Sequence, residues 1–227
     1  MAADAQQPLA LVVFLENVGH ISGLNLPAWL MNVIDFVTEE YAKILLRLYG
    51  AYRRYDKVII LEDAQATGPN LSTALVEASQ THVVDVLLLV HGYTDCLVGY
   101  KARERVGRET FAPLLAAYQR DPSLLNLRMV YGVNCYGASL APLWTALGAQ
   151  AVNGAIGVNW MPEPSLTIFL RNWLTGAAYS TAVERSNLGA MRFWRRLLKP
   201  QADGSDHAAI ASSRQIVFGQ RDVRIHH

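Results

Sequence analysis

The chain has 227 residues, of which 52% are hydrophobic and 17% are charged, and its formal net charge is +1. This length and apolar content predict one large domain with a covered core and exclude a globally disordered chain. The near-neutral charge gives no electrostatic case for nucleic acid, and no apolar run reaches the roughly 18–20 residues of a membrane span.

Short apolar runs alternate along the chain with longer segments of helical periodicity. In chain order we expect a strand at Leu9–Leu15, a helix at Leu26–Tyr52, a strand at Lys57–Leu61, a helix at Leu71–Ser79 capped by Asn70, a strand at Val84–Val90, a helix at Glu109–Gln119, a strand at Leu127–Asn134, a helix at Leu140–Leu147, a strand at Ala151–Val158, one or two helices within Pro164–Leu198, a loop at Pro200–Ser213 and a strand at Arg214–Phe218. This alternation predicts a three-layer α/β fold with a mainly parallel sheet of about six strands. We expect a single domain over residues 1–227, with flexible ends at 1–8 and 220–227.

Two of the expected strands end on a reactive side chain beside a glycine. The run Val84–Val90 is followed by His91-Gly92, and the run Leu127–Asn134 is followed by Cys135-Tyr136-Gly137. The segment between the two endings has room for one crossover helix, which usually puts two parallel strands side by side with their C-terminal ends at one edge. Open α/β sheets carry their chemistry at that edge. We therefore predict that a histidine base faces a cysteine thiol there.

The cysteine content indicates the compartment. Two cysteines cannot make a disulfide framework, and no cysteine or histidine cluster has zinc spacing, so we expect neither a metal nor a cofactor. The first eight residues lack a basic stretch ahead of an apolar core, so we expect no signal peptide. A cytoplasmic protein is expected, because reducing conditions preserve a thiol.

The order of strand, His-Gly, helix, strand and Cys resembles the caspase-like cysteine peptidases, which include caspases, metacaspases, gingipains, legumains, separases and CHAT domains. Further stretches are similar and lie in the same order: Leu61–Thr67 with Asn70 and Leu75 (metacaspases), Leu147–Val152 with Trp160 and Phe169–Gly176 with Ala182 (CHAT domains), and Ile216–Gly219 (gingipains). The similarity extends from about Leu9 to Gly219 and implies a three-layer caspase-like sandwich.

The resemblance also implies the roles of three residues. Cys135 would be the nucleophile, and His91 would be the general base that later protonates the leaving amine. The backbone N–H groups of Gly92 and Cys135 would form the oxyanion hole. The substrate would be a polypeptide laid along a sheet edge, and control would come from a partner chain or from homodimerisation, with no nucleic acid and no membrane as partner.

The expected substrate pocket lies at the same edge. Relatives place specificity residues at the end of the first strand, which here is Glu16-Asn17. We expect Val133 at the pocket floor, with Glu16, Asn17 and Trp160 at its sides. Val133 stands where metacaspases carry an acidic residue and caspases a glutamine, so a strict preference for Asp is not expected. The Glu16 carboxylate would favour a basic residue, or otherwise a large neutral one, before the scissile bond.

Other interpretations stay open. Cys135 is also of the type that fills a buried core, and Cys96 is either a second thiol near the site or an incidental one. Val133, and Val90 in place of the first glycine of Gly-His-Gly, favour an inactive binding module. An α/β-hydrolase with a cysteine nucleophile would need a further strand and helix between the two motifs and a later histidine, for which His207 and the terminal pair remain.

Overall fold

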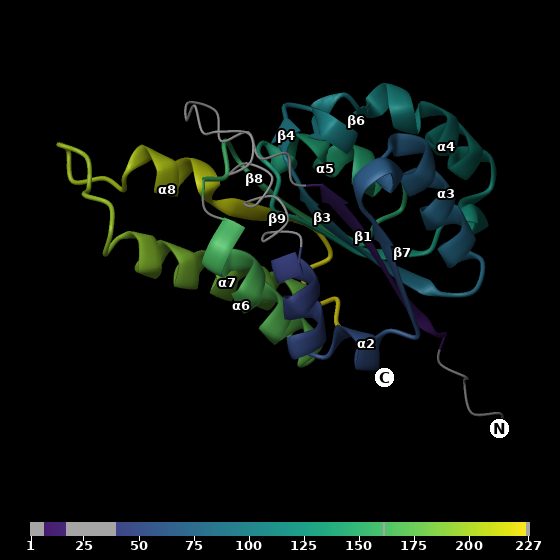
Figure 1. The fold of residues 1–227 in the computed structure, drawn as a ribbon, viewed down its shortest axis with the longest axis horizontal. Helices are drawn as coiled ribbons and strands as arrows, with labels where there is room; N and C mark the ends of the chain where they lie inside the picture. Colours follow the sequence, from purple (N-terminus) through teal and green to yellow (C-terminus); the bar gives the residue numbers. More distant parts are fainter. Residues whose placement is uncertain (1–6, 17–39, 161, 226–227) are drawn as a thin grey trace.

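The computed structural model describes residues 7–16, 40–160 and 162–225 (Figure 1). Its main sheet has six strands in the order β2-β1-β3-β7-β8-β9, all parallel except the antiparallel β9. The strands are β1 (Leu9–Glu16), β2 (Lys57–Leu61), β3 (Val83–Val90), β7 (Leu127–Gly132), β8 (Ala151–Ala155) and β9 (Gln215–Gly219). The predicted mainly parallel sheet of about six strands is confirmed.

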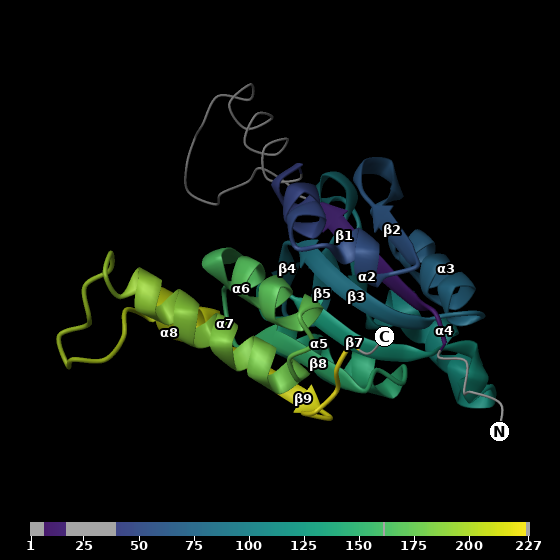
Figure 2. The ribbon, with the colours of Figure 1, turned by 90° about the horizontal axis from the view of Figure 1, so that it is seen from below.

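Helices cover both faces of the main sheet, as Figures 1 and 2 show. One face packs against α3 (Gly68–Ser79), α4 (Arg108–Arg120) and α5 (Gly137–Ala146), and the other against a helical segment at 40–48, α2 (Ala51–Arg54), α6 (Pro162–Leu174) and α7 (Tyr179–Trp194). Along β1, Val12 and Phe14 enter the first core, while Leu11 and Val13 enter the second. Strands buried on both faces read as continuous apolar runs, which is why the sequence predicts them well.

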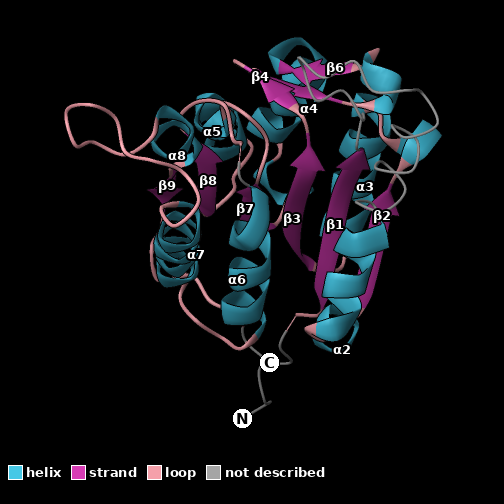
Figure 3. Cartoon of the chain, turned by 60° about the vertical axis from the view of Figure 1, so that its left-hand side comes forward, coloured by secondary structure: helices cyan, strands magenta, loops and turns pink. Residues whose placement is uncertain are grey.

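A second, antiparallel sheet is the main element that the sequence did not predict. It consists of β4 (Gly92–Tyr93), β5 (Cys96–Val98) and β6 (Arg105–Gly107) and lies between β3 and α4 in the chain. Figure 3 shows it beyond the C-terminal ends of β1 and β3. Strands of two or three residues are too short to produce a readable alternation of apolar and polar positions.

Several element boundaries differ from the prediction. Helix α3 begins at Gly68, and its N-cap is Thr67, whose Oγ1 accepts the Asn70 N–H at 3.4 Å. The predicted loop at 200–213 contains α8 (Ala208–Ser213). The predicted helix Leu26–Tyr52 is described only from residue 40, and Gly50, with φ of 78°, separates the segment 40–48 from α2. Residues 26–39 lie outside the described residues.

Residues 220–225, which we expected to belong to a flexible end, pack against the second core. The side chains of Val223 and Ile225 are buried, and the backbone N–H of Tyr179 donates to the Val223 carbonyl oxygen at 2.8 Å. The two apolar side chains bind this end to the second core. Within the described part of the chain, no helix is long and apolar enough to cross a membrane.

A buried ion pair joins β3 to β7 near their N-terminal ends. The Arg128 guanidinium donates from Nε to Asp85 Oδ1 at 2.9 Å and from Nη2 to Oδ2 at 2.7 Å. Asp85 Oδ2 also accepts from the Tyr55 hydroxyl at 2.6 Å and from Trp173 Nε1 at 3.2 Å. Asp85 is 0% exposed and Arg128 is 7% exposed, so the four hydrogen bonds compensate for taking the charges out of water.

Candidate active site

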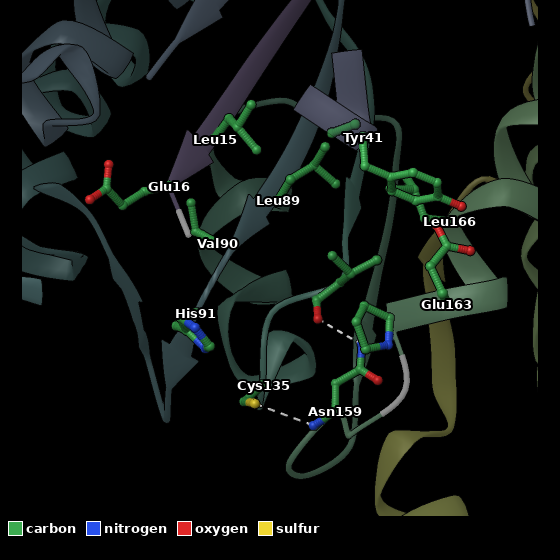
Figure 4. Close-up of a pocket in the computed structure, with 13 residues that line it drawn as sticks. Leu15, Glu16, Tyr41, Leu89, Val90, His91, Cys135, Asn159, Glu163 and Leu166 are labelled. Atoms are coloured by element: carbon green, nitrogen blue, oxygen red, sulfur yellow. Dashed lines mark hydrogen bonds between the residues drawn. The ribbon is translucent and has the colours of Figure 1, made fainter. Parts of the chain in front are cut away.

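The C-terminal ends of β3 and β7 meet at one pocket. The strands are parallel neighbours, with Leu88 opposite Gly132 at the end of the register. His91 follows β3 directly, and Cys135 lies in the turn between β7 and α5. Both residues line a pocket of about 230 Å³, which Figure 4 shows in close-up. The structure therefore brings the predicted base and the predicted nucleophile to the same edge of the sheet.

The turn that carries Cys135 is tight. Tyr136 adopts a left-handed conformation with φ of 54°, and its backbone N–H donates to the Gly157 carbonyl oxygen at 2.7 Å. Helix α5 then begins at Gly137 and packs against Gly154 of β8. A Cβ added at Gly154 would overlap the backbone of Gly137 and Ala138. Glycine at position 154 thus allows the helix to start immediately after the cysteine.

Replacing Gly154 with alanine is expected to destabilise the protein, because the added methyl meets backbone that cannot rotate away. Overpacking of this kind costs about 3 kcal/mol in the free energy of unfolding. Urea denaturation measures the difference. The control is Gly189→Ala in α7, where the new Cβ meets only the end of the flexible Ile168 side chain and alanine raises helix propensity. Equal stability of the two variants would contradict this account of the turn.

Gly92 lies against the same turn. A Cβ at position 92 would come within 2.6 Å of the Cys135 carbonyl oxygen, so only glycine permits this approach between the two segments. Asn134 is 1% exposed, and its Nδ2 donates to the same carbonyl oxygen at 3.3 Å. The two residues predicted to supply oxyanion-hole donors, Gly92 and Cys135, are therefore held next to each other.

The Cys135 thiol is partly buried. Its Sγ accepts the backbone N–H of Asn159 at 3.3 Å, and Asn159 Nδ2 donates to the Val133 carbonyl oxygen at 2.6 Å (Figure 4). Burial raises the pKa of the thiol, while the neighbouring N–H groups of Asn159 and of Cys135 itself lower it less. The neutral thiol is therefore the main form at neutral pH, and a base must remove its proton before it attacks.

The other predicted pocket residues are distributed unevenly. Glu16 and Val133 line the pocket, and Glu16 Oε1 accepts the backbone N–H of Lys101 at 2.8 Å. Trp160 does not line it: the side chain is 57% exposed, and its backbone N–H donates to Ser213 Oγ at 2.9 Å. Asn17 lies outside the described residues. Cys96, also predicted as an alternative thiol, lies in β5 and donates to the Leu97 carbonyl oxygen at 3.1 Å.

Sequence reasoning missed part of the pocket wall. Tyr41 and Leu166 line it, and Glu163 contributes a carboxylate. The available indication was the sequence Met161-Pro162-Glu163-Pro164, which sets an acidic residue between two prolines after an expected strand. Nothing in that pattern says which way the segment turns. Among the described residues, no group of three His, Cys, Asp or Glu side chains could hold a metal ion.

Comparison with known proteins identifies the fold. No family model matches the chain, and no curated protein matches it. The crystal structure of the Arg-specific cysteine proteinase gingipain R is similar with a TM-score of 0.59 and 15% identity, over 96% of this chain and 48% of the other. The complex of the RgpB pro- and mature domains from Porphyromonas gingivalis is similar with a TM-score of 0.55, at the same identity and coverage. The chain spans about half the length of these structures, and it has a caspase-like fold.

Proposed function

We propose that this protein is a cysteine endopeptidase that uses a His91–Cys135 dyad. The observation that supports it most is the meeting of these two side chains in one pocket, at the C-terminal ends of adjacent parallel strands. The similar solved structures are described as cysteine proteinases, and the fold is the same. A thiol with a base beside it is the arrangement that acyl transfer requires.

The proposed reaction has two stages. His91 takes the proton from the Cys135 thiol, and the sulfur attacks the carbonyl carbon of the scissile peptide bond while the N–H groups of Gly92 and Cys135 bind the oxyanion. The C–N bond then breaks as His91 gives the proton to the departing amine, which leaves a thioester on Cys135. In the second stage water adds to that carbon, the C–S bond breaks, and the proton of the water returns to the sulfur through His91.

The α/β-hydrolase interpretation is disfavoured by the topology. That fold would need a further strand of the main sheet between the two motifs along the chain, but the strands found there, β4, β5 and β6, form a sheet of their own. His207, one of the later histidines open to this interpretation, accepts the Ala209 N–H with its Nδ1 and caps α8. It does not line the pocket.

Regulation and location belong to the same proposal. One similar structure is a complex between pro- and mature domains, which supports control of this chain by a partner segment or chain. Homodimerisation is the alternative means of control. Both described cysteines are free, which fits a reducing compartment such as the cytoplasm.

Alkylation tests the proposed nucleophile. Iodoacetamide is expected to reduce the rate at which a mixed peptide library is cleaved, in proportion to the fraction of Cys135 that is modified. The Cys96→Ser variant is expected to have wild-type activity and to lose it to iodoacetamide in the same way. Because the pKa of Cys135 is raised, the thiolate fraction in the free protein is small at neutral pH and the alkylation rate should keep rising with pH beyond the ordinary thiol pKa. Full modification of Cys135 with retained cleavage would contradict the proposal. A library that is not cleaved at all would favour the binding-module alternative.

A further inference from the structure

The pocket beside Cys135 is apolar over most of its wall and acidic at two points. Apolar side chains from β1, β3, the β7 turn and α6 line it: Leu15, Leu89, Val90, Val133 and Leu166. The two carboxylates are Glu16 and Glu163, which lie on opposite sides of the pocket in Figure 4, with Leu15, Leu89 and Val90 between them. Its volume of about 230 Å³ is below the roughly 300 Å³ of small-molecule sites, so it suits one long side chain.

Among the described residues, one oxygen of the Glu163 carboxylate has a hydrogen-bond partner and the other has none. Its Oε2 accepts the Thr167 N–H at 3.3 Å, and its backbone carbonyl oxygen accepts from Trp194 Nε1 at 2.8 Å. Oε1 is buried and has no hydrogen-bond partner among the described residues. Burial raises the pKa of this carboxyl, and the Thr167 and Tyr41 contacts lower it less. A buried carboxylate oxygen without a partner costs free energy, so a cation entering the pocket would be favoured.

Within the described part of the chain, no lysine or arginine forms an ion pair with the Glu163 carboxylate. Neither lysine nor arginine lines the pocket. Lys43, on the same helical segment as Tyr41, is already paired with Glu40 at 2.6 Å and Glu62 at 2.9 Å. The described wall of the pocket that holds the thiol therefore carries two carboxylates and no lysine or arginine, and the apolar part of this wall suits the methylene stem of a long basic side chain.

We propose that Glu163 is the specificity-determining residue and selects a lysine or arginine side chain immediately before the scissile bond. This inference rests on the proposed peptidase function. It assigns the pairing with a basic substrate side chain to Glu163 at the start of α6, whereas the sequence analysis assigned it to Glu16 at the end of β1. The stem would contact Leu89, Val133 and Leu166, and the cationic head would bind Glu163 Oε1. Glu163 would take no part in bond breaking, because its role is to hold the substrate.

Matched substrates test the role of charge. Peptides with lysine or arginine before the cut are compared with peptides carrying norleucine or citrulline, which keep the length and lose the charge. We expect wild-type kcat/KM to be about 100-fold higher for the charged member of each pair, the size of effect that losing one partner of a buried charge pair produces. Glu163→Gln should reduce this ratio to within a few-fold, mainly by raising KM for the charged peptides.

Two control variants separate this role from a general one. Glu184→Gln changes an exposed glutamate of α7 and is expected to keep the wild-type ratio. Glu16→Gln is expected to keep most of it, because Glu16 lies across the pocket from the position proposed for the cationic head. A ratio that survives Glu163→Gln, or that is lost only in Glu16→Gln, would overturn the assignment.

A binding measurement keeps the inference testable without turnover. Calorimetry with the Cys135→Ala variant compares a lysine peptide with its norleucine analogue, and the charged peptide is expected to bind about 100-fold more tightly, unless Glu163 is also changed to Gln. If the charged peptide binds selectively but no peptide is cleaved, the specificity inference stands and the proposed reaction fails. If peptides are cleaved with no charge preference, the proposed reaction stands and the inference about Glu163 is wrong.

Discussion

His91→Ala and Cys135→Ala are each expected to lower kcat/KM for a cleaved peptide by about 10⁴- to 10⁶-fold, and the double variant should be little worse than either. The reason is that the two residues act on one proton. Without the base, the buried thiol with its raised pKa stays protonated, and without the thiol, the base has nothing to activate. Steady-state kinetics on the four proteins measures the coupling.

The controls are His82→Ala and Cys96→Ser, which remove the same residue types outside the pocket and should leave activity near the wild-type level. Circular dichroism should show that all variants fold. Losses that multiply in the double variant would mean that His91 and Cys135 act independently, and near-wild-type activity in His91→Ala would refute the mechanism.

Breaking the buried ion pair is expected to have the largest effect on stability. Arg128→Met leaves the Asp85 carboxylate, which is 0% exposed, without its cation, and such a loss costs about 3–5 kcal/mol in the free energy of unfolding. The double variant Asp85→Leu/Arg128→Met should cost less than the sum of the single changes, because no uncompensated charge remains buried. Guanidinium denaturation measures all three.

Arg195→Met serves as the matched control, because Arg195 donates from Nε to Asp206 at a similar 2.7 Å in an exposed ion pair. Such pairs are worth about 0–1 kcal/mol. A stability loss in Arg128→Met no larger than that in Arg195→Met would show that the buried pair contributes little.

The main sheet and the positions of His91 and Cys135 could be predicted from the sequence for one physical reason. Parallel strands covered on both faces are continuous apolar runs, and the residues directly after such runs must lie at the sheet edge. The prediction for His91 and Cys135 needed only the strand ends and the rule for parallel crossovers. Val133 was placed in the pocket by the resemblance, because it stands where metacaspases carry an acidic residue and caspases a glutamine.

The rest of the site depends on contacts between segments that are distant in the chain. Glu163 reaches the pocket because α6 packs over the sheet, and Tyr41 comes from the helical segment on the same face. The pair Asn159-Trp160 was predicted to line the pocket, and only Asn159 does, because the direction of side chains just past a strand is not fixed by the alternation within it. The second sheet was missed because its strands have only two or three residues.

Each of the two central strands has a charged residue near its start and leads into a reactive one beyond its end. On β3 these are Asp85 and His91, and on β7 they are Arg128 and Cys135. Six residues of strand separate Asp85 from His91 by about 20 Å at 3.3 Å per residue. Changes that far apart combine additively in stability. Substitutions around the pocket are therefore expected to leave the stability contributed by the Asp85–Arg128 pair, at the opposite end of the same two strands, unchanged.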